Sequence, residues 1–266
     1  MQRVIMFVLG AVAIFVLAVT TADAAKPGGS VALGVAGVPD YEGSNDFEAL
    51  PVLISRYTWA GGQYLHIGGT ADAGRAAQIK ANLMPESRSP TWQMGPVLQY
   101  RLGRDNVKDN QADNMKDIDD AVELGFFVGE ERGPMYVGFN FVTDVSNKHE
   151  GFVAELAGTY TNNVSDRLQV MLGAGLAFAN SDYMETYFGI TPADSVKSGL
   201  PVYTPDDAVK DIGFSISTRY TPGANWGIMG FIKYNALLGD AKDSPLVDDE
   251  GSYNQPIAGA AITYTY

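Results

Sequence analysis

The sequence of 266 residues contains no cysteine. This absence excludes disulfide bonds, cysteine-based zinc sites, iron–sulfur clusters and a thiol nucleophile. Histidine occurs only twice, which is too few for a histidine-rich metal centre, and we expect no cofactor. Positive charge is also scarce, because 18 Lys and Arg against 31 Asp and Glu give a net charge of −13. Since nucleic-acid binding needs a basic surface, we expect no nucleic-acid partner.

Long apolar runs are missing as well, except at the N-terminus. Residues 4–19 are uninterruptedly apolar, Arg3 precedes them, and Ala22-Asp23-Ala24 follows. A short apolar run after a positive charge and before a small-x-small site is typical of a secretory signal peptide. The sequence therefore predicts a cleaved signal peptide over residues 1–24 and a single mature domain over residues 25–266. No later run is long enough for a membrane-spanning helix.

What the mature sequence does contain is alternation with a period of two. In residues 166–180, for example, Leu168, Val170 and Leu172 alternate with Arg167, Gln169 and Met171. Such alternation predicts β-strands, so the fold class is all-β. A soluble sandwich would also alternate, but these strands have about the length that a tilted strand needs to cross a bilayer. Their second faces are rich in Gly and Ala, which suits a narrow lumen, and we predict an antiparallel transmembrane β-barrel.

Connection lengths favour the same fold. We expect about twelve strands, at residues 29–38, 47–59, 63–71, 75–83, 91–103, 118–131, 134–143, 150–161, 166–180, 211–221, 225–238 and 253–266. Short turn-like connections nearly alternate with long ones, and residues 72–74 form the one exception. Bacterial outer-membrane barrels have short periplasmic turns and long external loops. Leu172 is expected to face lipid and Gln169 the lumen.

Aromatic residues near the expected strand ends fit interfacial girdles. They are Tyr57, Trp59, Trp92, Tyr100, Tyr160, Tyr220 and Trp226. The last expected strand ends on Tyr266, which resembles the C-terminal signal by which outer-membrane barrels are recognised for assembly. Together with the signal peptide and the loop pattern, this ending predicts location in the outer membrane of a Gram-negative cell.

Several loop motifs, in this order along the chain, resemble the MipA/OmpV family of outer-membrane proteins. They are residues 39–44 (PDYEGS), 103–105 (GRD), 149–151 (HEG), 183–191 (YMETYFGIT) with 198–201 (SGLP), and 237–246 (LLGDAKDSPL). The resemblance implies a non-enzymatic outer-membrane barrel. It implies one of three functions: a scaffold for murein enzymes, a narrow porin-like channel for small solutes, or a surface adhesin or receptor. The partners it implies are outer-membrane lipid and lipopolysaccharide, and a periplasmic murein hydrolase or synthase.

Two groups of residues are candidates for functional roles. The first is a loop motif at the barrel mouth: Tyr183, Met184, Thr186, Tyr187, Phe188, Gly189, Ser198, Gly199 and Pro201. An exposed loop normally avoids so many aromatic side chains, so this loop either folds across the mouth or caps the outer girdle. The second group comprises charges on the lumen faces, which line a channel or pair as a plug: Arg101, Glu123, Glu155, Arg167, Arg219 and Lys233.

Two further features have less specific interpretations. Residues 104–120 and 239–250 are acidic, which fits either a solvated surface or divalent-cation binding, including bridges to lipopolysaccharide. His149 lies near Ser146 and Asp144, but sequential neighbours on one short loop are not evidently arranged as base, nucleophile and orienter. We therefore expect no catalytic residue and no metal site.

Overall fold

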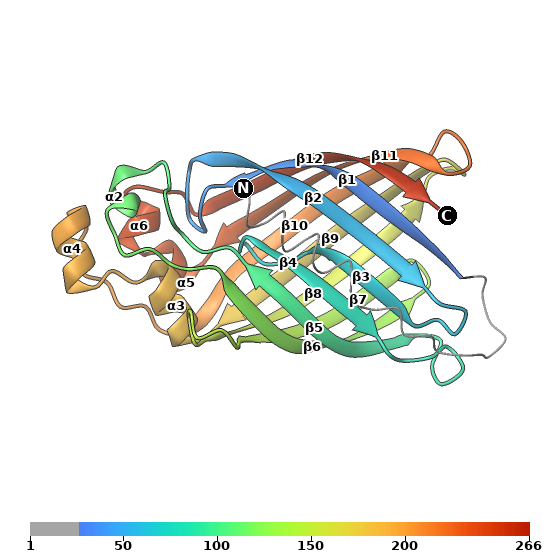
Figure 1. Ribbon diagram of the computed structural model, residues 1–266, viewed down its shortest axis with the longest axis horizontal. Helices are drawn as coiled ribbons and strands as arrows, with labels where there is room; N and C mark the ends of the chain where they lie inside the picture. The colour runs from blue at the N-terminus through green and yellow to red at the C-terminus, as the bar shows by residue number, and fades with distance from the viewer. Residues whose placement is uncertain (1–26) are drawn as a thin grey trace.

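The computed structural model describes residues 27–266 as a closed antiparallel barrel (Figure 1), so the predicted signal peptide lies outside the described residues. Strands neighbour one another in chain order, and the first closes against the last. This arrangement confirms the predicted all-β barrel and its twelve strands. They are β1 (Gly28–Pro39), β2 (Phe47–Thr58), β3 (Tyr64–Gly69), β4 (Ala76–Asn82), β5 (Trp92–Arg101), β6 (Ala121–Arg132), β7 (Met135–Asp144), β8 (Phe152–Asn163), β9 (Leu168–Ala179), β10 (Ala208–Tyr220), β11 (Trp226–Leu237) and β12 (Asn254–Thr265).

The outer face of the barrel is an exposed apolar surface. Leu172 on β9 is 48% exposed, and similar side chains project all round the barrel. They include Leu33, Leu124, Phe126, Leu156, Phe214, Ile228, Ile232 and Ile262. A continuous apolar surface of this kind is not stable in water, so it is the lipid-facing side. The inward face of β9 carries Gln169, which bonds Asn163 from β8 at 2.9 Å.

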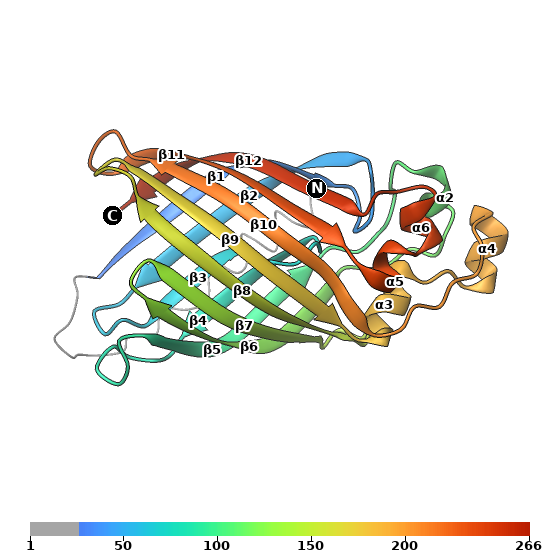
Figure 2. The ribbon, with the colours of Figure 1, turned by 180° about the vertical axis from the view of Figure 1, so that it is seen from behind.

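The two ends of the barrel differ (Figures 1 and 2). Short turns and the C-terminus lie at one end, whereas all the helices lie at the other. Because short turns are periplasmic in bacterial barrels, we call these the inner and the outer end. The helices are α2 (Asn110–Asp113), α3 (Ser181–Phe188), α4 (Pro192–Ser198), α5 (Gly239–Lys242) and α6 (Pro245–Asp248). Among residues 27–266, none of the helices is long and apolar enough to span a membrane.

Exposed aromatic side chains gather toward the inner end. Trp92, Tyr160, Tyr220, Trp226 and Tyr266 are each at least 42% exposed. Tyr266 also stacks on Tyr57, with ring centroids 6.3 Å apart, and its backbone N–H donates to Gly29 O at 3.0 Å. Aromatic side chains prefer the boundary between lipid and water, so they mark the periplasmic edge of the bilayer.

One connection at the outer end departs from the pattern of long loops. Residues 70–75 join β3 to β4, two strands that are short compared with the other ten. Asp72 and Ala73 are almost fully buried, so this segment turns into the barrel. The exception in the predicted alternation of loop lengths is therefore a structural feature, which we call the plug segment.

Candidate functional site

The plug segment, residues 70–75, crosses the lumen to the opposite wall. The Asp72 backbone N–H donates to Glu155 on β8 at 3.1 Å, and that of Ala73 donates to Asp211 on β10 at 3.0 Å. Asn235 on β11 donates to Ala71 O at 3.0 Å. Since β3 and β4 stand across the barrel from β9 and β10, these bonds fasten the segment to the opposite wall.

Asp72 is the centre of a buried charge cluster. Its Oδ2 lies 3.0 Å from Arg101 Nη1 and 3.3 Å from Lys210 Nζ. Lys210 Nζ also lies 2.6 Å from Asp211 Oδ2 and 2.5 Å from Glu42 Oε1. Buried charges are tolerated only when they are paired and hydrogen-bonded. Each cation here contacts more than one carboxylate, which ties β5, β10 and the β1–β2 loop to the plug segment.

His149 extends this cluster toward Glu123 on β6. Its Nδ1 accepts the Gly151 N–H at 3.1 Å, so its Nε2 is the donor toward Glu123 Oε1, at 2.9 Å. Ser146 Oγ instead donates to Asp144 Oδ1 at 2.7 Å. With both ring nitrogens occupied, His149 has no nitrogen left to act as a base for Ser146.

Helix α3 covers the cluster from the outer side. Tyr183, Met184, Tyr187 and Phe188 lie on one face of the helix, as their spacing requires, and all four are buried. The Tyr183 hydroxyl donates to Glu42 Oε2 at 2.6 Å and accepts from Arg101 Nη1 at 3.0 Å. Burial raises the pKa of Tyr183 and of Tyr187, so both hydroxyls remain protonated.

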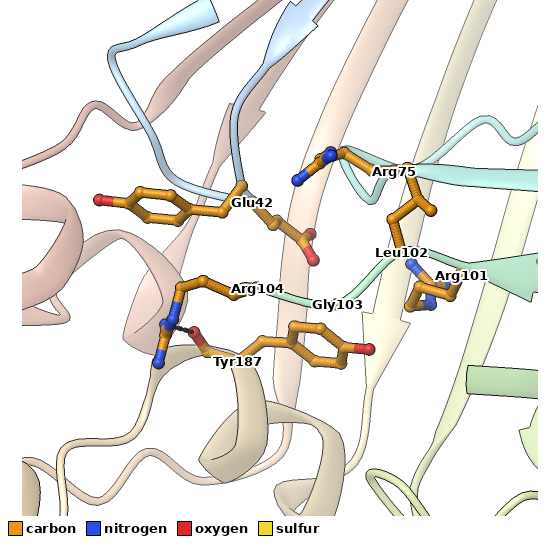
Figure 3. Close-up of a pocket in the computed structure, with 8 residues that line it drawn as sticks. Glu42, Arg75, Arg101, Leu102, Gly103, Arg104 and Tyr187 are labelled. Carbon is orange, nitrogen blue, oxygen red and sulfur yellow. Dashed lines mark hydrogen bonds between the residues drawn. The ribbon is translucent and has the colours of Figure 1, made fainter. Parts of the chain in front are cut away.

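The space left at this level is small (Figure 3). Arg104 Nη1 donates to Tyr187 O at 3.3 Å, and the cavity beside these residues has a volume of about 10 Å³. Glu42, Arg75 and Leu102 also line it. Such a cavity holds about one water molecule. Arg101, Tyr183 and Lys210 at this level are each at most 1% exposed, so the outer half of the lumen is closed here.

The remaining outer loops form a second apolar cluster above α3. Its buried members are Tyr41, Val107, Ala112, Met115, Ile190, Leu200 and Leu246. Helix α4 begins after Thr191, whose hydroxyl accepts the Asp194 N–H at 3.1 Å, and Asp194 Oδ1 accepts the Lys116 N–H at 2.8 Å. Burial acts to raise the pKa of Asp194, but the Thr191 hydroxyl, which donates to Asp194 Oδ2 at 2.6 Å, the Lys116 N–H and Arg104 lower it overall. The outer loops thus pack on one another.

The inner half of the lumen is open by contrast. A cavity of about 730 Å³ reaches from residues 70–71 of the plug segment to the β6–β7 turn at residues 133–134. We call it the vestibule. Its lining includes Arg56, His66 and Lys80, together with amide, hydroxyl and tyrosine side chains. It ends at the plug segment, and its other end lies among the periplasmic turns.

The predicted lumen charges lie in three different places in the structure. Arg101, Glu123 and Glu155 meet in or beside the buried cluster, and Lys233 Nζ donates to Thr70 O at 3.1 Å. Arg219 lies toward the inner end of β10. Arg167 is exposed in the β8–β9 turn rather than in the lumen, because Ser165 Oγ accepts the N–H groups of Arg167 and Leu168 and holds a turn there.

The predicted loop motif is divided as well. Tyr183, Met184, Tyr187 and Phe188 pack into the mouth, whereas Thr186 is only partly buried and bonds back to Asp182 O at 2.9 Å. Gly189 ends α3, Ser198 is buried in α4, and Gly199 and Pro201 are exposed. Gly199 has a φ of 81°, a conformation that glycine adopts at little cost. The second part of the motif therefore shapes the outer loops.

Sequence analysis missed the residues that organise the site. Asp72, Glu42 and the adjacent pair Lys210 and Asp211 lie on three separate segments, and only the exceptional shortness of 72–74 pointed to one of them. Several acids of the outer loops also act as internal acceptors. Asp109 caps α2, for example, and Asp240 accepts the Asp206 N–H at 2.8 Å. In the described part of the chain, no group of three His, Asp or Glu is placed to hold a metal ion.

Comparison with known proteins gives a consistent result. The model of a family described as MltA-interacting protein MipA matches residues 31–266. The MltA-interacting protein of Escherichia coli K12 is 24% identical over 256 residues, which cover 96% of this chain and 97% of that protein. Outer membrane protein OmpV of Vibrio cholerae is 25% identical over 162 residues, 59% of this chain and 60% of that protein. Among solved structures, the NanC porin aligns with a TM-score of 0.47 at 12% identity, covering 87% of this chain and 98% of that one.

Proposed function

The chain belongs to the MipA family of outer-membrane β-barrels, and on that premise we propose that it is a closed barrel that holds a murein-cleaving enzyme at the periplasmic face. The observation that carries this proposal is the sealed outer half of the lumen. The plug segment, the charge cluster around Asp72 and helix α3 together leave a cavity of only about 10 Å³ beside Tyr187. A scaffold needs no path through the barrel, whereas a channel does.

The inner rim offers a fixed surface for such a partner. Its turns are short, and the longer β4–β5 turn is held by hydrogen bonds from Glu86 N to Gly61 O and from Arg88 N to Pro85 O, both 2.9 Å. A pre-ordered surface loses little conformational entropy on binding. The name of the family and of its Escherichia coli member refers to interaction with MltA, a murein transglycosylase, which gives the partner class.

The test is capture of a purified murein transglycosylase of the MltA type by the refolded barrel in detergent. We expect capture by the unmodified protein. A short polar epitope inserted into one periplasmic turn, at residues 164–167, 222–224 or 85–90, should reduce it in at least one variant. The same epitope inserted after Gly199, which is exposed at the outer end, is the matched control and should leave capture unchanged. No capture by any version, or loss only in the control, would refute the scaffold.

A narrow channel is the second candidate, and the vestibule favours it. A cavity of about 730 Å³ facing the periplasm is larger than a scaffold requires. The plug segment is held by hydrogen bonds and ion pairs rather than covalently, so a displaced plug would leave a path. Single-channel conductance in a planar bilayer separates the two functions, because the scaffold predicts no steps in the unmodified protein.

A further inference from the structure

Three basic side chains stand side by side on the vestibule wall. Arg56 on β2 pairs in register with His66 on β3, and His66 pairs with Lys80 on β4. All three line the vestibule. Neighbouring strands lie about 4.8 Å apart, so the three side chains form a continuous row across the sheet. We call them the basic row.

The basic row has no anionic partner in residues 27–266. None of the three forms an ion pair with Asp or Glu there, although eight Lys or Arg ion pairs occur elsewhere. Arg56 lies over the Tyr64 ring at 3.8 Å, and Lys80 lies 5.6 Å from the Phe127 centroid. Arg56 and Lys80, the two cations of the row, flank His66, and like charges this close in a sheet repel each other. The row therefore has a cost that a ligand anion would offset.

Carboxylates near the row are already engaged. Glu155 accepts the Asp72 N–H at 3.1 Å and Asn140 Nδ2 at 2.9 Å. Glu131, at the inner rim, accepts Gln93 Nε2 at 2.6 Å. Glu155 is the acid that interacts electrostatically with Lys80, but its carboxylate is fixed to the plug segment. Thus the basic row still presents donors toward the open volume.

Apart from Glu131 and Glu155, the rest of the vestibule is lined mostly by neutral hydrogen-bonding and aromatic groups. They are Tyr64, Gln78, Gln93, Tyr136, Phe139, Asn140, Thr159, Thr161 and Asn163, among others. Amides and hydroxyls both donate and accept hydrogen bonds, as sugar hydroxyls require, and aromatic rings offer flat apolar faces. A small inorganic anion would leave most of these groups without contacts.

We infer that the vestibule is a binding site for an acidic saccharide, with the carboxylate on the basic row and the sugar hydroxyls on the facing amides. The ligand enters from the periplasm, because the plug segment closes the other end. The site goes beyond the proposed scaffold and does not depend on it, since the row lies inside the lumen and the partner enzyme would bind at the rim.

The first experiment is calorimetric titration of the refolded barrel with N-acetylmuramic acid and with N-acetylglucosamine. The two sugars differ by the lactyl group that carries the carboxylate. We expect binding of the acid, weakened by added salt because the row is only partly buried, and no measurable binding of the neutral sugar. Equal binding of both sugars, or of neither, would overturn the proposal.

Variants locate the binding. Lys80→Gln should weaken binding of N-acetylmuramic acid by about tenfold or more, as expected when a charge-assisted hydrogen bond is lost. The control Arg132→Gln removes a cation at the inner rim that is paired with Glu130 outside the row, and it should leave affinity unchanged. Equal losses in both variants would show general attraction by the rim and refute the site. Retention of the heat-modifiable band on unboiled gels checks folding.

A second measurement, of thermal unfolding, tests whether the basic row serves ligand binding or the packing of the barrel. Without ligand, Lys80→Gln should raise the midpoint of thermal unfolding, because it removes repulsion along the row. A lowered midpoint would mean that Lys80 is needed for packing, and it would contradict the proposal.

Glucuronic acid distinguishes the ligand sources. Similar affinity for it would point to acidic sugars in general, and much weaker affinity would point to a murein fragment. Capture of the transglycosylase is measured separately, so failure of either proposal is recognisable.

Discussion

The two halves of the lumen are built from the same strands yet differ in how their charges are used. In the outer half, Arg101 and Lys210 each contact at least two buried carboxylates. In the inner half, Arg56, His66 and Lys80 stand in a row without a carboxylate partner in the described part of the chain. The outer half leaves a cavity of about 10 Å³ beside Tyr187, and the inner half one of about 730 Å³.

The difference arises from segments that enter the lumen rather than from the wall. The plug segment and α3 bring carboxylate, hydroxyl and aromatic groups to the outer half. The inner half receives no such segment among residues 27–266, and its charges therefore face open space. Paired charges make the outer half of the lumen a structural element, whereas unpaired charges make the inner half a candidate binding site.

The largest expected effect is on conductance. A variant lacking residues 71–74 and 184–203 removes the plug segment and most of α3 and α4, so the vestibule should open to the outside. We expect clear single-channel steps in a planar bilayer, against none for the unmodified barrel. Deleting 184–203 alone should leave the barrel closed, because the plug segment still crosses the lumen. Steps of equal size in all three proteins would mean that neither segment seals it.

Asp72→Ala tests the pairing in the outer half. The substitution leaves Arg101 and Lys210 with one fewer carboxylate in a buried site, and it should lower the free energy of unfolding by about 3–5 kcal/mol. Urea unfolding of the barrel in lipid vesicles measures this change. Asp207→Ala, at an exposed position of the outer loops, is the control and should alter stability by no more than about 0.5 kcal/mol. Similar losses in both variants would argue against a stabilising cluster.

Two substitutions on β9 compare the cost of placing a charge against lipid with the cost of placing one in the open half of the lumen. Leu172→Arg places a charge on the lipid-facing side and should cost about 2–4 kcal/mol of unfolding free energy. Gln169→Lys, on the inward face near the inner end, should cost far less because water reaches the vestibule. Both values come from the same vesicle unfolding assay. The opposite ranking would place the two faces the other way round.

Substitution of Asp194 is expected to have the smallest effect on stability, and this effect depends on pH. Its pKa is lowered in the folded protein, so its stabilising contribution is present above the ordinary aspartate pKa and is lost as pH falls through the lowered value. At neutral pH, Asp194→Asn should destabilise α4 locally by about 1 kcal/mol. Hydrogen exchange of residues 192–198 should therefore be faster in the variant at pH 7, and the difference should shrink as the pH falls through the lowered pKa of Asp194. A difference that persisted at low pH would exclude this carboxylate as its cause.

Much of the fold could be predicted because alternation and loop length are local signals. The predicted strand at 166–180 corresponds to β9, Leu172 faces outward as expected, and the helices all lie in the predicted long loops. Buried aromatic side chains in 183–188 were also recognisable as too apolar for a solvated loop. Arg167 was placed in a strand because alternation continues into the turn that Ser165 holds.

The sequence by itself determined the barrel, its lipid-facing side and the unequal ends, because each depends on residues close together in the chain. Only the tertiary structure decided which charges meet. Asp72 finds Lys210 across 138 positions in the chain through closure of the barrel and inward folding of a six-residue segment. The same closure aligns Arg56, His66 and Lys80 through strand register. A period of two places a side chain on the lumen face, but the pairing of distant strands selects its neighbours.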